Sequence, residues 1–209
     1  MRAHIEGERT DLAGMLAALT PDQWDAPTLC DGWRVREVVA HMTLPFRTST
    51  ARFLVEMLKA GGRMNRMIDR TAARDAAGMT SEELLASLRD NIAHPWTPPG
   101  GGAAGALSHD VIHGLDISVA LGLDRRVPLD RLRVVLGGMT AKSVAYFGAG
   151  LDGVSLRATD LDWTFGEGAP VRGAAQDLLL VVCGRKLPPG LLSGADAGRF
   201  SRVTTQWAP

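Results

Sequence analysis

The sequence predicts a mainly α-helical protein with a small α+β extension at its C-terminal end. Apolar residues recur at helical spacing through the first two-thirds of the 209 residues. A capping box from Thr80 to Glu83 marks a helix start within this part. From Val154 the pattern changes to the alternation that is typical of strands. We therefore expect a helical bundle over residues 1–148 and a small α+β domain over residues 149–209.

Glycine and proline divide the helical part into segments. We expect helices from about Glu8 to Leu19, Arg34 to Thr43, Phe53 to Leu58, from Thr80 onward, through the histidine pair to Leu121, and from Pro128 to about Gly148. Pro45 is expected to bend or end the second helix, because proline lacks the amide that a helix interior requires. The C-terminal part is expected to hold strands at Val154–Thr159 and Asp162–Gly166 and a last helix at Arg172–Val182.

The composition excludes several classes of protein. Lys+Arg and Asp+Glu both number 23, so no overall charge favours nucleic acid as a partner. Cys30 and Cys183 are the only cysteines and form no C-x-x-C pair, which favours a reducing cytoplasm. The first residues carry acids and no apolar core, so we expect no signal peptide. No apolar run approaches the length of a membrane span, and no membrane partner is expected.

Three histidines carry the functional prediction. His109 and His113 are four residues apart, so they share one face of a predicted helix. His41 lies in another predicted helix and borders its apolar stripe. Two imidazoles on one helix and a third on a facing helix would form a three-nitrogen metal site with an open position, which is typical of catalytic zinc. The ligands alone also suit nickel, iron or copper.

Other interpretations of these residues stay open. An interior histidine is more often an ordinary core residue, and a histidine pair at this spacing also arises by chance. Asp116 could accept a ring N–H from His113, although a solvated helix aspartate is more common. Arg185 could clamp a substrate carboxylate, or could be a cation that stabilises a helix end. Cys30 is expected to be a buried small residue, and Asp110 is expected to point away from the histidines.

The segment Trp24–His41 resembles the N-terminal signature of the mycothiol-dependent maleylpyruvate isomerase family, which belongs to the DinB-like four-helix bundle superfamily. His113–Asp116 resembles the second signature of that family. The tail from Thr164 to Lys186 resembles the small C-terminal domain that many members carry. The resemblance implies a DinB-like up-down four-helix bundle that holds a divalent metal through His41, His109 and His113. Zinc is the expected metal, and nickel or another divalent ion is the alternative.

The chain departs from that family at one ligand position. Where the isomerases carry a glutamate four residues before the last histidine, this chain has His109. Three histidines resemble the broader DinB-like set, which includes bacillithiol and mycothiol S-transferases. A neutral ligand in place of an anionic one leaves more net charge on the cation, which should lower the pKa of a bound water or thiol further. The exchange argues against maleylpyruvate itself as the substrate.

Three functions remain in competition. The first is a mycothiol-dependent S-transferase or isomerase in which a metal-bound thiolate attacks a small electrophile, with mycothiol as the thiol cosubstrate. The second is a metal-dependent hydrolase that uses water at the same site. The third is a non-catalytic metal-binding or stress-response module. The expected partners are a small electrophile and a low-molecular-weight thiol, and the chain is expected to be a monomer or homodimer.

Overall fold

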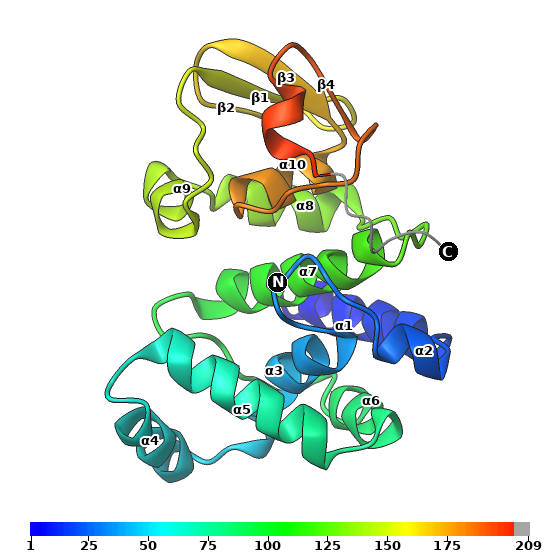
Figure 1. The fold of residues 1–209 in the computed structure, drawn as a ribbon, viewed down its shortest axis with the longest axis vertical. Helices are drawn as coiled ribbons and strands as arrows, with labels where there is room; N and C mark the ends of the chain where they lie inside the picture. The colour runs from blue at the N-terminus through cyan, green and yellow to red at the C-terminus, as the bar shows by residue number, and fades with distance from the viewer. Residues whose placement is uncertain (203–209) are drawn as a thin grey trace. The chain divides into compact units, whose positions relative to one another are not determined.

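A computed structural model describes residues 1–202 of the chain (Figure 1). The helices are α1 Arg2–Ala17, α2 Pro21–Trp24, α3 Val35–Arg47, α4 Thr50–Lys59, α5 Met64–Gly78, α6 Ser81–Arg89, α7 Gly102–Ala120, α8 Leu129–Gly137, α9 Ala141–Phe147 and α10 Ala175–Val182. The strands are β1 Val154–Ala158, β2 Thr164–Phe165, β3 Ala169–Gly173 and β4 Leu192–Ser193, followed by the 3-10 helix η1 Ala197–Phe200. The chain divides into two compact units, Met1–His113 and Gly114–Pro209.

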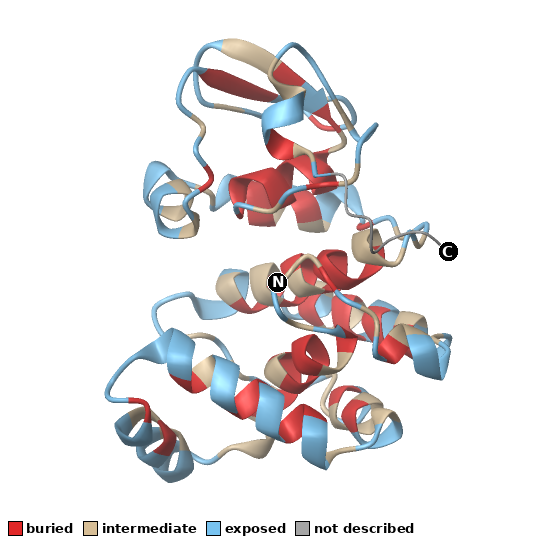
Figure 2. Ribbon diagram, in the orientation of Figure 1, coloured by how far each residue is buried: buried red, intermediate tan, exposed pale blue. Residues whose placement is uncertain are grey.

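The first unit is a bundle of helices. Helix α3 packs against α5 and α6, and α1 packs against α6. Buried faces line the inside of this bundle, and exposed faces lie on its outside (Figure 2). Its core is built from aliphatic side chains, namely Leu12, Leu16, Val38, Val39, Met42, Leu84, Leu88, Leu107 and Val111. Burial of these apolar stripes is the main force that holds the helices together.

The second unit contains a small four-stranded sheet that packs against helix α10. The strand order is β2-β1-β3-β4, with β1 and β3 parallel and both edge pairs antiparallel. Every residue of α10 is buried, because α8, α9, β1 and β3 all pack against this helix. The C-terminal part therefore contains both strands and a helix, as predicted for an α+β segment.

Some predicted element boundaries are wrong. The helix expected from Pro128 to Gly148 is two helices, α8 and α9, and Thr140 caps the second of them. The last helix begins at Ala175 and not at Arg172, because residues 169–173 form β3. Pro45 does not end α3, which continues to Arg47.

The capping box is confirmed, and the domain boundary stays a prediction. The Thr80 hydroxyl accepts a hydrogen bond from the Glu83 amide at 3.1 Å, and the Glu83 carboxylate accepts one from the Thr80 amide at 2.7 Å. The division between the two units falls within α7, earlier than the boundary expected at residues 148 and 149. Helices α8 and α9 pack on α10 and so lie with the sheet in the second unit.

Among residues 1–202, no helix combines the length and the apolar character that a membrane crossing requires.

Candidate metal centre

Helices α3 and α7 bring the three predicted histidines together in the first unit. The ring centroids of His41 and His109 are 5.0 Å apart, and each of these rings lies 4.9 Å from the ring of His113. One ring nitrogen from each histidine lies within 4.8 Å of the other two. All three side chains are half-buried. The helical spacing of four residues puts His109 and His113 on the same side of α7, as expected.

The spacing of the nitrogens fits a divalent metal ion. The Nε2 atoms of His41 and His109 are 3.1 Å apart. Two nitrogens that bind one tetrahedral zinc at about 2.0–2.1 Å would lie about 3.4 Å apart. One ring nitrogen from each of the three histidines is close enough to the other two to bind the same ion. The donor set therefore fits a metal with an open coordination position, and zinc is the usual metal for such a set.

A carboxylate holds the ring of His109. Asp110 Oδ1 lies 3.1 Å from Nδ1 of His109, and its Oδ2 accepts a hydrogen bond from Nε of Arg9 at 2.8 Å. The side chains of Arg9 and Asp110 are 0% and 2% exposed, so this ion pair is shielded from water. A proton on Nδ1 that faces the carboxylate leaves Nε2 with its lone pair turned toward His41. The expectation that Asp110 points away is wrong.

Arg9 also anchors the loop that precedes α7. Its Nη1 donates to the carbonyls of Asn91, Ile92 and His94, at 3.4, 3.2 and 2.8 Å. Trp96 lies in this loop, and its ring centroid is 5.4 Å from the ring centroid of His109 in the candidate metal centre. One buried guanidinium thus fixes both the acceptor for His109 and the loop whose aromatic ring borders this histidine.

A tight loop before α3 supplies two more neighbours. The amide of Trp33 donates to the carbonyl of Cys30 at 2.9 Å, and Gly32 takes a φ of 79° that L side chains rarely adopt. This turn places Cys30 Sγ 3.8 Å from Nδ1 of His113 and the ring of Trp33 5.2 Å from that of His41. Cys30 is half-buried rather than buried, and its nearness to His113 was missed because 83 residues separate them.

The two weaker predicted site residues lie in the second unit and bind each other. Asp116 accepts from Nε and Nη2 of Arg185, both at 2.9 Å, and the Asp116 side chain is fully buried. The Nη1 of Arg185 donates to the carbonyl of Cys183 at 2.8 Å. A bidentate pair of this kind orients both groups strongly. The roles predicted for Asp116 and Arg185 at the metal centre stay predictions.

Two functional neighbours could have been found from helical spacing. Arg9 lies on the same stripe as Leu12 and Leu16, three and seven residues before them, which predicts its burial. Asp110 lies on the stripe of Leu107 and Ile117 in the same way. A buried arginine on one helix requires a partner, and a buried aspartate beside a histidine pair is the natural one. No comparable local signal points to Cys30.

One family model matches part of this chain. Residues 5–95 match the model of the mycothiol maleylpyruvate isomerase N-terminal domain. The resemblance seen in the sequence is therefore confirmed for this part of the chain, which includes α3 and His41.

Solved structures share the fold. The crystal structure of the mycothiol-dependent maleylpyruvate isomerase is 13% identical, with a TM-score of 0.61, and covers 94% of this chain and 92% of that chain. A histidine-to-alanine mutant of that isomerase is 14% identical with a TM-score of 0.58 and the same coverage. The predicted fold class, a mainly α protein of the DinB-like bundle type with a small C-terminal α+β extension, is confirmed.

Two relatives extend over nearly the whole chain. They are uncharacterized proteins of Mycobacterium tuberculosis, MT0041 of strain CDC 1551 / Oshkosh and Rv0036c of strain ATCC 25618 / H37Rv. Each is 27% identical and covers 99% of this chain and 94% of the relative.

Proposed function

We propose that this chain is a divalent-metal-dependent enzyme that uses a low-molecular-weight thiol, mycothiol, as an S-transferase or isomerase of a small electrophile. The observation that supports the proposal most is the set of three imidazoles whose ring nitrogens lie within 4.8 Å of one another. The match of residues 5–95 to the isomerase domain model makes mycothiol the first thiol to test. A reducing cytoplasm, where such thiols stay reduced, is part of the proposal.

In this proposal His41, His109 and His113 hold the metal, with zinc first and nickel or another divalent ion as alternatives. When bound, the ion would supply Lewis acidity that lowers the pKa of a thiol and so generates a nucleophile near neutral pH. Three protein ligands leave an open position, whereas structural zinc usually has four.

The residues around the histidines prepare this site before any ligand arrives. Asp110 keeps the Nδ1 of His109 occupied and so directs Nε2 inward. Cys30 lies beside Nδ1 of His113 on the far side of that ring. The rings of Trp33 and Trp96 cover His41 and His109 and reduce the access of water to them. Lower access of water strengthens electrostatic interactions at the site.

The residues near the second signature have a role in the proposal as well. Asp116 follows His113 by three residues on α7 and pairs with Arg185. In the proposal Arg185, which keeps 16% of its side chain exposed, recognises an anionic group of the substrate, and Asp116 orients it.

Turnover assays with and without thiol test the proposal. The purified chain, reconstituted with zinc, is incubated with maleylpyruvate, with an epoxide and with an activated alkene, each in the presence and absence of mycothiol. We expect turnover of one electrophile only when mycothiol is present, and none in a His113→Ala variant. Turnover without thiol would instead establish the hydrolase alternative. Inactivity of the metal-loaded chain toward every electrophile in both conditions would favour the non-catalytic module.

A further inference from the structure

Helix α4 presents its apolar stripe to solvent. Ala51, Leu54, Val55 and Leu58 follow the spacing i, i+3, i+4 and i+7 and therefore share one face of the helix. Leu54, Val55 and Leu58 are 57%, 47% and 79% exposed. In a helix that packs by hydrophobic burial, a stripe of this spacing faces the core. The stripe of α4 does the opposite.

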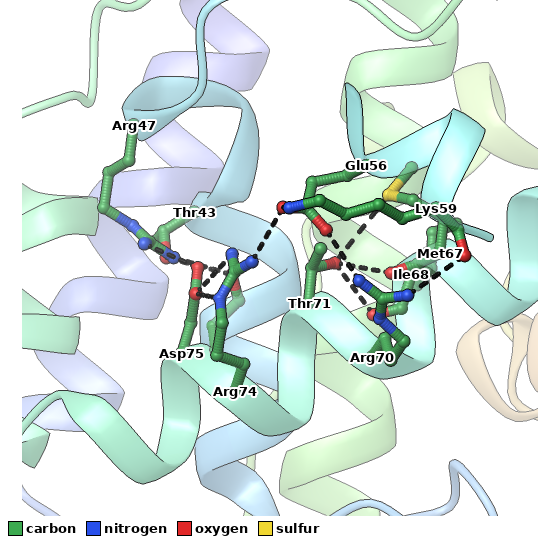
Figure 3. A network of polar contacts seen from close by, with 11 residues as sticks. Thr43, Arg47, Glu56, Lys59, Met67, Ile68, Arg70, Thr71, Arg74 and Asp75 are labelled. Carbon is green, nitrogen blue, oxygen red and sulfur yellow. Dashed lines mark hydrogen bonds and ion pairs between the residues drawn. The ribbon is translucent and has the colours of Figure 1, made fainter. Parts of the chain in front are cut away.

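On the inner face of α4, a buried carboxylate forms ion pairs with several cations. Glu56 is only 6% exposed, and its carboxylate accepts from Lys59 Nζ at 3.2 Å and from Arg70 Nη2 at 3.1 Å (Figure 3). Arg74 Nη1 forms a third ion pair with it at 3.2 Å. The hydrogen bond from Lys59 and the neighbouring arginines hold the pKa of Glu56 below its usual value. The carboxylate therefore stays ionised at neutral pH and keeps α4 on α5 with the leucines outward.

The segment that carries this stripe is cationic. Between residues 49 and 66 the cations are Arg52, Lys59, Arg63 and Arg66, all exposed. The one acidic residue in that stretch is Glu56, which is buried. Met64, at the start of α5, adds a further apolar side chain that is 41% exposed. A chain with no net charge thus concentrates aliphatic and positive side chains, without an exposed carboxylate, in one segment.

We propose that residues 49–66, the α4 surface, lie on an anionic phospholipid membrane. Leu54, Val55 and Leu58 would enter the boundary between headgroups and acyl chains, and the flanking cations would meet lipid phosphates. The expectation that the chain has no membrane partner rests on the lack of an apolar span. A helix that lies in the interface needs no such span, because only one of its faces enters the lipid.

A second copy of the chain fits this surface less well. An isologous pair would bring two cationic surfaces together, and like charges repel. A stable protein interface buries about 800 Å² on each partner and involves roughly 20–30 residues a side, whereas the stripe offers four apolar residues. A lipid surface requires neither a large area nor a complementary shape.

Cosedimentation of the full chain with vesicles tests the proposal. Vesicles of phosphatidylglycerol mixed with phosphatidylcholine are compared with vesicles of phosphatidylcholine alone. We expect the chain to bind the anionic vesicles only, and the binding to weaken with salt. The double variant Leu54→Gln/Leu58→Gln should lower the partition coefficient at least about tenfold. Arg63→Gln/Arg66→Gln should also lower it, by about 30-fold, since two cations near an anionic surface contribute about 2 kcal/mol together.

Matched controls make a negative result informative. Tyr146→Gln removes an aromatic side chain that is 76% exposed on α9, and it should bind vesicles like the unchanged chain. Circular dichroism checks that each variant is folded. Equal binding to both kinds of vesicle, no binding at all, or normal binding by the leucine variant would overturn the proposal. A dimer by light scattering that the leucine variant converts to a monomer, without vesicle binding, would show a protein interface instead.

Discussion

Asp110 connects the metal-centre histidine His109 to a fully buried cation, Arg9. Each carboxylate oxygen of Asp110 contacts a different residue: Oδ1 lies 3.1 Å from His109 Nδ1, and Oδ2 lies 2.8 Å from Arg9 Nε. Burial of a carboxylate is costly without a paired charge, and Arg9 supplies that charge. The ion pair therefore holds the carboxyl group of Asp110 beside His109, where it favours one tautomer of the ring.

Replacement of this acceptor should weaken metal binding. In Asp110→Asn the side chain keeps its size but loses the charge that orients His109 and pairs with Arg9. We expect metal affinity to fall about 10–100-fold, the usual effect of losing a hydrogen-bond partner of a ligating histidine. Competition with a chromogenic chelator measures this affinity. Asp90→Asn removes an exposed carboxylate and should leave it unchanged; equal affinities for all three proteins would contradict the role of Asp110.

Loss of the cation should destabilise the fold. Arg9→Met leaves Asp110 buried without its partner and frees three carbonyls in the loop before α7. Breaking a buried pair from one side costs about 3–5 kcal/mol of unfolding free energy. Denaturant unfolding measures the loss. The double variant Arg9→Met/Asp110→Leu should recover part of it, because no charge is then left buried; a larger loss in the double variant would contradict this account.

The two cysteines should differ in reactivity. Burial raises the pKa of the Cys183 thiol to about 12, and its side chain is almost inaccessible, at 2% exposure. Cys30 is half-buried. Since the thiolate is the reactive form, an aromatic disulfide reagent at pH 8 should titrate one thiol per native chain and two in denaturant. Cys30→Ser should abolish the native reaction and Cys183→Ser should not. Two reactive thiols in the native chain would show that Cys183 is accessible.

The stability of the second unit should depend on the protonation of Asp177. Burial raises the pKa of this carboxyl from 3.8 to about 6, against the effect of Arg126. The native state therefore holds the proton more tightly than the unfolded state, so this group's contribution is lost as pH rises through about 4 to 6. Asp177→Asn should raise Tm relative to the unchanged chain at pH 8 and have much less effect at pH 4. An equal difference at both pH values would refute the raised pKa.

The sequence predicts the histidine site well because helical periodicity is local. His109 and His113 share a face on α7 whatever the rest of the fold does, and His41 borders the apolar stripe of α3. That α3 and α7 meet at these residues is a tertiary relationship. It followed from the resemblance to a known family and not from spacing, whereas the mainly α fold class with a small α+β end followed from the apolar periodicity.

The misses have physical causes as well. The helix expected from Pro128 was extended through Gly137 and Gly138, where glycine lowers helix stability and the chain breaks between α8 and α9. The last two residues of β3, Arg172 and Gly173, were expected to begin the last helix, since short segments do not distinguish strand from helix. Helical spacing predicts the burial of Arg9 and Asp110, but their contact joins residues 101 positions apart. The contact of Cys30 with His113 joins residues 83 positions apart, and no local pattern indicates it.

Metal content is the measurement that tests the central claim most directly. Elemental mass spectrometry on chelator-free protein, purified and then reconstituted with zinc or nickel, is compared among the unchanged chain, His113→Ala and Tyr146→Gln, which alters an exposed side chain. We predict about one divalent ion per chain in the unchanged protein and in Tyr146→Gln, and loss of that ion in His113→Ala. A folded, unchanged chain that takes up no metal, or a His113→Ala variant that keeps it, would contradict the account.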